Sequence, residues 1–111
     1  MIQPMDTPLQ FEKTPTFEKL MSRILTSKEY DKLCHVLTIN PERGDVIPGG
    51  GGIRKIRVGA KGRGKSGGAR VIYYYIRNES LILFITIYTK NEKETLTDRE
   101  LATLRTFVKE L

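Results

Sequence analysis

The sequence predicts a single α+β domain with two N-terminal helices, an antiparallel β-sheet meander and a C-terminal helix. Two helix-start patterns lie in the first third of the chain, strand-like segments fill residues 53–88, and a further helix-start pattern follows. Helices and strands that are grouped in this way are typical of α+β architecture. With 111 residues, the chain is expected to form one domain, residues 1–111.

The first helix is predicted by its start and by the spacing of its apolar residues. Thr14 followed by Pro15 marks the start, because threonine caps a helix and proline fits its first position. The apolar residues that follow recur at helical spacing: Phe17, Leu20, Met21 and Ile24. A short edge strand is expected before this helix, at residues 9–11.

The second helix follows the first closely. Thr26 and Glu29 have the spacing of a capping box, which predicts its start. Asn40 precedes Pro41, and because a residue before proline avoids the helical conformation, the helix is expected to end there. Its apolar stripe comprises Tyr30, Leu33, Cys34 and Leu37. We expect a helical hairpin that buries its apolar side on the sheet.

Three strands are predicted at residues 53–58, 69–77 and 81–88. A glycine-rich basic loop, residues 59–68, joins the first two, and a tight turn at residues 78–80 joins the last two. The third strand is apolar at nearly every position, which is typical of a strand that is covered on both faces.

The C-terminal helix is predicted by a third capping pattern. Thr97 and Glu100 again have the spacing of a capping box. The apolar residues after them form a stripe of Leu101, Leu104, Val108 and Leu111.

Positive charge is concentrated in the middle of the chain. The sequence has 19 Lys and Arg against 13 Asp and Glu, a net charge of +6, yet residues 46–78 hold eight basic residues and no acidic one. The eight are Arg54, Lys55, Arg57, Lys61, Arg63, Lys65, Arg70 and Arg77. Strand alternation puts Lys55 and Arg57 on the face opposite Ile56 and Val58. A local field of one sign favours a polyanionic partner.

Residues 59–66, GAKGRGKS, match the phosphate-binding pattern G-x-x-x-x-G-K-[ST]. A loop of that kind needs a helix directly after it, so that the helix N-terminus faces the phosphates. Residues 69–77 instead have a strand pattern. We therefore expect this basic loop to contact a nucleic-acid backbone, and we treat a nucleotide triphosphatase as a weaker alternative.

The residue types limit the chemistry that this basic segment can perform on RNA. Metal-independent cleavage uses the 2′-OH beside the scissile phosphate, and it needs a proton acceptor, stabilisation of the phosphate charge and help for the leaving 5′-oxygen. The one histidine, His35, lies on a predicted helix, and the basic segment contains no carboxylate. The work would fall to Lys, Arg and Tyr side chains, of which arginine offers a fixed fork to phosphate oxygens. No metal and no cofactor are expected.

The segments GGIRKIR, GKSGGARVIYY and IYTKNE together resemble the RelE superfamily, specifically its HigB-type toxins of bacterial type II toxin–antitoxin systems. The resemblance runs from about Phe11 to the C-terminus and is densest between Gly44 and Glu92. It implies a RelE-like microbial ribonuclease fold and a ribosome-dependent endoribonuclease that cleaves mRNA in the 30S A site and inhibits translation. It also implies a HigA-like helix-turn-helix antitoxin as partner.

The family pattern implies catalytic roles for Lys55, Arg57, Arg70 and Lys90. The first three would bind and activate the scissile phosphate, and Lys90 at the end of the third strand would assist. The best-known members carry Lys-Arg at that strand end and a tyrosine a few residues later. This chain has Lys90-Asn91 and then the residues ETL at 94–96.

RNA-binding roles are expected for Arg54, Lys61, Arg63, Lys65 and Tyr88. The loop cations would hold phosphates without sequence preference and with a steep dependence on salt. Tyr88, Tyr73 or Tyr75 would offer a face for base stacking, although at least one of residues 73–75 is expected in the core because neighbouring strand residues face opposite ways.

Purely structural roles for these residues also fit the sequence. Lys55 and Arg57 are also compatible with the solvated face of a strand, and Arg70 with a structural salt bridge. Cys34 and His35 are expected to pack on the second helix rather than to serve a site. The alternative function is a non-catalytic RNA- or ribosome-binding module, and a DNA-binding repressor is weaker still, since no helix-turn-helix pattern is visible.

A cytoplasmic location without membrane contact is expected. The N-terminal residues lack the basic start and apolar run of a secretory signal, and no segment reaches the roughly 20 apolar residues that span a membrane. Cys34 is the single cysteine, which excludes an internal disulfide and fits a reducing compartment.

Overall fold

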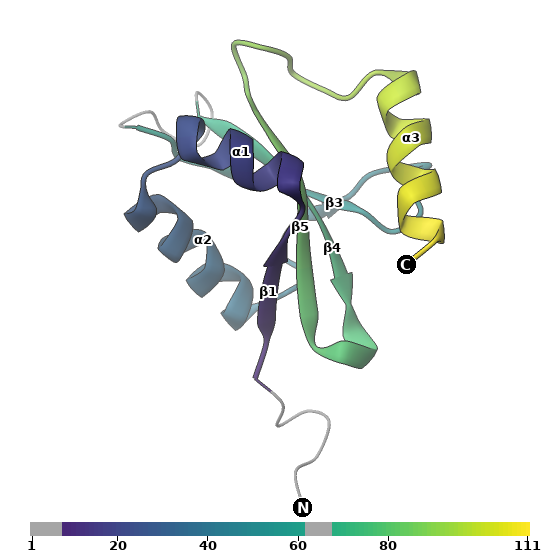
Figure 1. The fold of residues 1–111 in the computed structure, drawn as a ribbon, viewed down its shortest axis with the longest axis horizontal. Helices are drawn as coiled ribbons and strands as arrows, with labels where there is room; N and C mark the ends of the chain where they lie inside the picture. The colour runs from purple at the N-terminus through teal and green to yellow at the C-terminus, as the bar shows by residue number, and fades with distance from the viewer. Residues whose placement is uncertain (1–7, 62–67) are drawn as a thin grey trace, which may run out of the picture.

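The computed structural model describes residues 8–61 and 68–111, which form three α-helices and one five-stranded sheet (Figure 1). In chain order the elements are β1 (Gln10–Lys13), α1 (Pro15–Ile24), α2 (Ser27–Ile39), β2 (Asp45–Val46), β3 (Arg54–Val58), β4 (Ala69–Ile76), the 3-10 turn η2 (Arg77–Glu79), β5 (Leu81–Thr89) and α3 (Asp98–Lys109). The predicted α+β class, the helical pair, the three-stranded meander and the C-terminal helix are confirmed. None of these helices is both long and apolar enough to cross a membrane.

The sheet is mixed rather than purely antiparallel, with the strand order β1-β5-β4-β3-β2. The meander β3-β4-β5 is antiparallel as expected, but β1 runs parallel to β5, with Gln10 opposite Leu81 and Lys13 opposite Phe84. A parallel pair needs a long crossover connection, and most of the chain separates these two strands. The two-residue strand β2 at the opposite edge was not predicted, because two residues show no periodicity.

The three predicted helix starts are all present. Thr14 caps α1 by accepting a hydrogen bond from the backbone N–H of Phe17 at 3.0 Å. Complete capping boxes begin α2 and α3, at Thr26 with Glu29 and at Thr97 with Glu100. Because each capping side chain satisfies a backbone N–H that the helix leaves without a partner, these local patterns fix where the helices begin.

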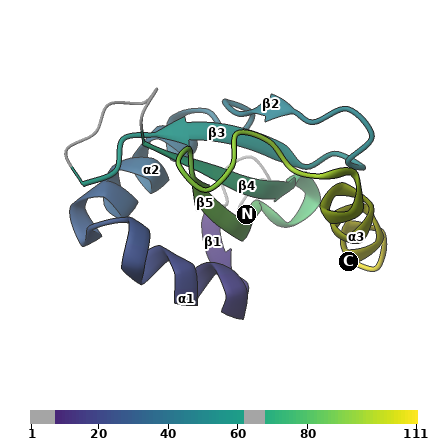
Figure 2. The ribbon, with the colours of Figure 1, turned by 90° about the horizontal axis from the view of Figure 1, so that it is seen from above.

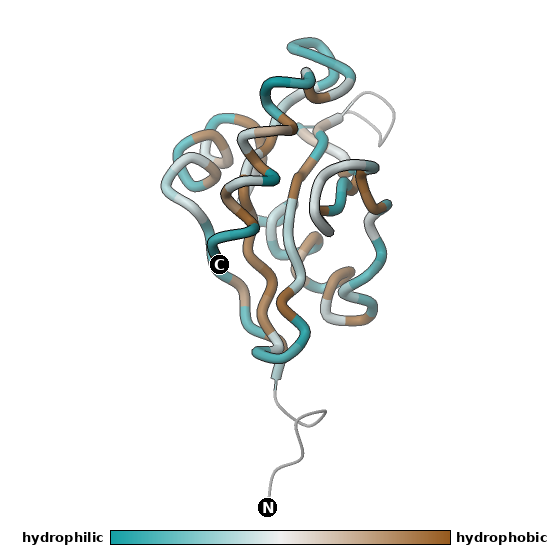
Figure 3. The backbone as a smooth tube through the Cα atoms, turned by 90° about the vertical axis from the view of Figure 1, so that its right-hand side faces the viewer, coloured by the Kyte–Doolittle hydropathy of each residue, from teal (hydrophilic) through white to brown (hydrophobic). Residues whose placement is uncertain are grey.

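The helices cover both faces of the sheet. Helices α1 and α2 lie against one face, which we call the α1/α2 face, and α3 lies against the other, the α3 face (Figures 1 and 2). The larger core, on the α1/α2 face, centres on Phe84, which stacks on Phe17 with ring centroids 5.0 Å apart. The smaller core, on the α3 face, joins Ile72 and Ile85 to Val108 of α3. Hydrophobic residues concentrate in the central strands (Figure 3).

Strand β5 contributes to both cores, as its apolar composition predicted. Ile82, Phe84 and Ile87 pack on the α1/α2 face, whereas Ile85 and Tyr88 pack on the α3 face. This pattern breaks strict alternation because the register shifts between Ile72 and Tyr73 of β4, where Ile85 is the extra residue on β5. Such a bulge turns every later side chain of the strand to the opposite face.

Candidate active site

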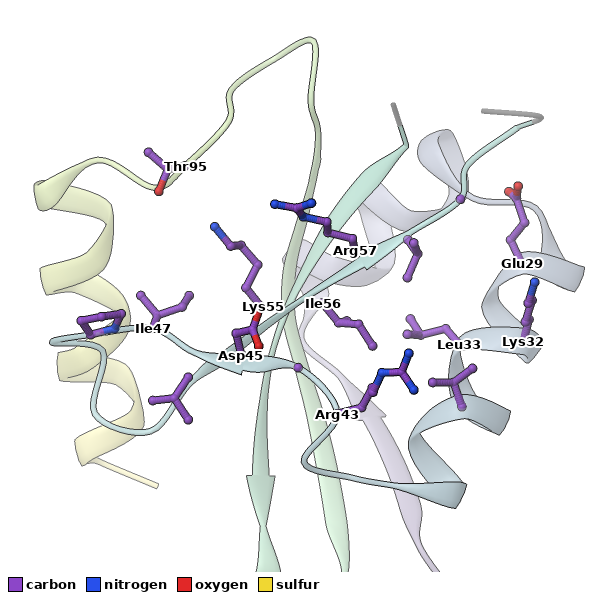
Figure 4. Close-up of a pocket in the computed structure, with 16 residues that line it drawn as sticks. Glu29, Lys32, Leu33, Arg43, Asp45, Ile47, Lys55, Ile56, Arg57 and Thr95 are labelled. Atoms are coloured by element: carbon purple, nitrogen blue, oxygen red, sulfur yellow. The ribbon is translucent and has the colours of Figure 1, made fainter. Parts of the chain in front are cut away.

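Cations from two neighbouring strands meet on the α3 face. Lys55 and Arg57 project from β3 to the side opposite Ile56, and Figure 4 shows both directed toward the loop that carries Thr95. Arg57 lies directly opposite Arg70 of β4 in the ladder. Directly opposite side chains have Cβ atoms about 5 Å apart, and like charges at that distance destabilise a sheet. The ladder therefore places two like charges beside each other at this point.

A hollow of about 150 Å³ opens where these cations meet. It is lined by Lys55, Arg57, Arg70, Lys90 and Glu94. All four residues that were predicted to be catalytic thus surround one space, although their roles remain a prediction. At this volume the hollow has room for a phosphate group. Four positive side chains and one negative one favour an anion there.

Arg70 is the buried member of this group. Only 5% of its surface is exposed, and its Nη1 donates to the carbonyl oxygen of Ala69 at 3.4 Å. Taking a charged group out of water costs several kcal/mol, so an arginine is rarely buried this deeply. Burial also removes rotamer freedom in advance, which presents the guanidinium in a fixed position to whatever enters the hollow.

The bulge in β5 brings the end of this strand to the same face. Tyr88 lies opposite Arg70, so both side chains point to the α3 side of the sheet. Lys90 follows two residues later and lines the hollow. If β5 had no bulge at Ile85, strict alternation from Phe84 would direct Tyr88 toward the α1/α2 face. No feature of the apolar segment 81–88 marks the position of this bulge.

The two residues that precede Glu94 are held by contacts to β5 and α3. The Glu92 carboxylate accepts hydrogen bonds from the Thr89 N–H at 3.2 Å and from the Thr89 hydroxyl at 3.0 Å, which hold its pKa below the usual range. The Lys93 ammonium pairs with Glu100 of α3 and lies 5.2 Å from the centre of the Tyr88 ring. Glu94, which lines the hollow, therefore follows directly on two residues that are held.

Glu94 is the lining residue that sequence reasoning missed. It lies outside the basic segment, five residues beyond the end of β5. The absence of a carboxylate from residues 46–78 suggested a site without one. Only the path of the chain after β5 brings Glu94 to the cations.

Tyr88 does not offer the stacking face that was expected of it. Its side chain is only 3% exposed, so a base has almost no surface to contact. Burial raises the pKa of its hydroxyl, while the nearby Arg70 acts in the opposite direction. Among the residues that the structure describes, nothing accepts or donates a hydrogen bond at this buried hydroxyl. We therefore withdraw Tyr88 as an RNA-stacking residue.

Arg54 is also placed away from the hollow, because alternation turns it to the α1/α2 face. Its Nη1 donates to the carbonyl oxygens of Glu42 at 3.0 Å and Gly44 at 2.8 Å, and its Nη2 lies 3.4 Å from the Glu42 carboxylate. Arg54 therefore holds the segment between α2 and β2, and we no longer assign it to RNA. The alternation of side chains along β3 already predicts that Arg54 lies on the same face as Ile56.

The basic loop is described only in part. The backbone N–H of Lys61 donates to the Glu29 carboxylate at 2.6 Å, and its ammonium donates to the Arg23 carbonyl oxygen at 2.5 Å, near the end of α1. Lys61 is thus tied to the helical pair and lies apart from the hollow. Arg63 and Lys65 lie outside the described residues. From Ala69 onward the chain is strand, as the argument against a nucleotide-binding loop expected.

The other residues that were singled out from the sequence lie in the core or on the surface, away from the hollow. Tyr73 is fully buried, which confirms that at least one of the three tyrosines belongs to the core. Cys34 packs partly against the larger core. His35 is exposed on α2 rather than packed, and neither residue lines the hollow.

A larger groove adjoins the hollow and shares Lys55 and Arg57 with it (Figure 4). Its volume is about 990 Å³, within the size range of ligand-binding clefts. It is lined by residues of α2, by residues 43–48, by residues 55–59 and by Thr95. The site therefore consists of a small cationic hollow beside a wide groove.

Comparison with known proteins connects this fold to one toxin family. The family model described as "RelE toxin of RelE / RelB toxin-antitoxin system" matches residues 13–111. A structure of an Escherichia coli RelE double mutant in the free state is similar, with a TM-score of 0.61, 14% identity, and coverage of 92% of this chain and 98% of that one. The isolated Escherichia coli RelE toxin gives a TM-score of 0.55 at 16% identity, over 89% of this chain and 98% of that one. At these identities, the two structures show a common fold.

Proposed function

This chain belongs to the RelE toxin family, and from that premise we propose that it is a ribosome-dependent mRNA endonuclease of a type II toxin–antitoxin system. One observation carries the proposal: Lys55, Arg57, Arg70 and Lys90 line one hollow of about 150 Å³, which has room for a phosphate. Preorganised positive charge at the point where a phosphate gains charge in the transition state is a main source of rate acceleration.

In the proposed reaction, Lys55, Arg57 and Arg70 hold the scissile phosphodiester. Arginine suits this role because its guanidinium stays charged and matches pairs of phosphate oxygens. Burial of Arg70 fixes its position before the RNA arrives. Lys90 provides the assisting cation. The attacking group is the 2′-OH of the RNA itself, so the proposed reaction uses no metal.

The size of the two cavities supports RNA rather than a small phosphorylated ligand. The hollow is small, about 150 Å³, so we place the phosphate in it and the adjoining ribose and base outside it. The larger groove begins at the same two residues, Lys55 and Arg57, and offers space for a flanking nucleotide. A phosphate in a chain, with nucleotides on either side, uses both spaces at once.

The proposed partners follow from the family and the resemblance. They are the ribosome with mRNA in the 30S A site, and a HigA-like helix-turn-helix antitoxin, with the toxin itself of HigB type. The proposed location is the cytoplasm, where ribosomes translate.

The direct test is cleavage of mRNA on purified ribosomes, mapped by primer extension. We expect the wild-type chain to cut, and a triple variant with Lys55→Ala, Arg57→Ala and Arg70→Ala to leave the mRNA intact while its circular dichroism spectrum is unchanged. The matched control removes three exposed cations elsewhere, Lys19→Ala, Lys28→Ala and Lys109→Ala, and should still cut.

Two results would count against the proposal. Cleavage by the triple variant would remove these residues from the mechanism. A wild-type chain that binds ribosomes without cutting mRNA would favour the non-catalytic binding module instead.

A further inference from the structure

In the part of the chain that the structure describes, Glu94 is the one carboxylate on the hollow, where it shares the lining with Lys55, Arg57, Arg70 and Lys90. A glutamate there weakens the attraction of the site for phosphate, since its charge opposes that of the four cations. If the hollow served only to bind phosphate, this residue would be a disadvantage. A role for the carboxylate in the reaction itself accounts for its presence.

Cleavage through the 2′-OH needs a group that accepts a proton at neutral pH. Lysine and arginine side chains are ordinarily protonated there, and burial raises the pKa of the nearby Tyr88 hydroxyl, which keeps its proton. A glutamate side chain is ordinarily ionised and can accept a proton directly. Among the described residues that line the hollow, Glu94 is the only carboxylate.

The surroundings of Glu94 also fit a catalytic position. The two residues before it are held, since Glu92 is bonded to Thr89 and lies 3.7 Å from Arg23, and Lys93 is paired with Glu100. The Glu94 side chain is exposed, so an RNA ribose can reach it. An accessible carboxylate that follows directly on two held residues can meet a ribose at the edge of the hollow.

We propose that Glu94 is the general base of the reaction, an inference that depends on the proposed endonuclease function. The Glu94 carboxylate takes the proton of the 2′-OH while the 2′-oxygen forms a bond to phosphorus. The bond between phosphorus and the 5′-oxygen breaks, and the leaving oxygen takes a proton from the Lys90 ammonium. The products are a 2′,3′-cyclic phosphate and a free 5′-hydroxyl. Water then returns the proton from Glu94 to Lys90, so both groups end as they began.

The test compares single-turnover cleavage of ribosome-bound mRNA by wild type, Glu94→Gln, Glu94→Asp and Glu79→Gln. Loss of a general base lowers the rate by about 10²–10⁴-fold, and we expect this for Glu94→Gln. Its half-saturating concentration should stay the same or fall, because a negative charge has left a phosphate site. Glu94→Asp keeps the carboxylate and should retain more activity than Glu94→Gln. Glu79→Gln makes the same charge change at an exposed residue of η2 and should match wild type.

The outcomes separate this inference from the proposed function. If the wild-type chain cuts and Glu94→Gln cuts within about threefold of the same rate, the proposal for Glu94 is wrong and the endonuclease function stands. A change in half-saturating concentration alone would likewise make Glu94 a binding residue and overturn the proposal. If the wild-type chain does not cut at all, both fail together. Circular dichroism of each variant checks that it is folded.

Discussion

The two faces of the sheet use their polar side chains in different ways. On the α1/α2 face, the Tyr73 hydroxyl donates to the Pro41 carbonyl oxygen and accepts from the Gly44 N–H, both at 2.8 Å, and Arg54 bonds to the same segment. On the α3 face, four cations share a hollow with a single carboxylate. The first set holds the chain together, whereas the second gathers charge that an anionic ligand can neutralise.

Neighbouring arginine positions make the contrast clear. Arg54 and Arg57 lie on the same strand, three residues apart, and alternation turns them to opposite faces. Arg54 bonds to backbone carbonyls of this chain, while Arg57 lies directly opposite another arginine. The difference supports the proposal that the chemistry of this domain belongs to the α3 face, and we expect its stability to depend mainly on the α1/α2 face.

The largest effect is expected where the α1/α2 face is most densely packed. Phe84 is fully buried and stacks with Phe11 and with Phe17, with ring centroids 5.8 and 5.0 Å away. Phe84→Ala should lower the free energy of unfolding by about 3–5 kcal/mol, because it removes a large buried ring and leaves a cavity. Urea unfolding measures this effect. A loss below about 1 kcal/mol would mean that this core does not carry the stability assigned to it.

Removing the hydroxyl group of one buried tyrosine on each face tests the comparison with the same atomic change. Tyr73→Phe should cost about 1–3 kcal/mol of unfolding free energy, since it leaves the buried Gly44 N–H without its acceptor. Tyr88→Phe should cost nothing or stabilise by about 1 kcal/mol, because its buried hydroxyl has no partner among the described residues. Thermal and urea unfolding of both variants measure the difference. Equal costs would show that the two hydroxyls are used alike.

Lowering the pH should have a smaller effect on stability, through the contact that fastens the segment after β5. The hydrogen bond from Lys93, followed by the Thr97 N–H, holds the pKa of Glu100 below its usual value of 4.5. A carboxyl with a lowered pKa contributes stability above that value and loses it as pH falls through the folded-state pKa. The advantage of wild type over Glu100→Gln should therefore shrink below pH 4.5. Unfolding midpoints at a series of pH values measure it, and a constant difference would contradict the assignment.

Sequence reasoning reached much of this fold because its signals are local. Caps at Thr14, Thr26 and Thr97 fix the helices through contacts three residues away. Alternation in β3 separates Lys55 and Arg57 from Ile56, and it also predicts the opposite position of Arg54, a consequence that was overlooked. The charge concentrated in residues 46–78 pointed to the strands that supply three of the lining cations.

The remaining features depend on contacts between distant segments. The bulge at Ile85 cannot be read from an apolar strand, because there is no alternation to interrupt. Parallel pairing of β1 with β5 depends on which sheet edge is left open. Glu94 reaches the hollow through the path of the segment between β5 and α3, which the pairing of Lys93 with Glu100 helps to define. Each of these is decided by the assembled fold.

The most direct test of the account compares Arg70→Met with Arg54→Met, two arginines on opposite faces of the sheet. We expect Arg70→Met to lower mRNA cleavage on ribosomes by about 10²–10³-fold and to change the free energy of unfolding little, since an apolar side chain of similar volume replaces a buried charge. Arg54→Met should cleave like wild type and lose about 1–3 kcal/mol of stability through its hydrogen bonds to Glu42 and Gly44. Full cleavage by Arg70→Met, or loss of cleavage in a folded Arg54→Met, would contradict the division between the two faces.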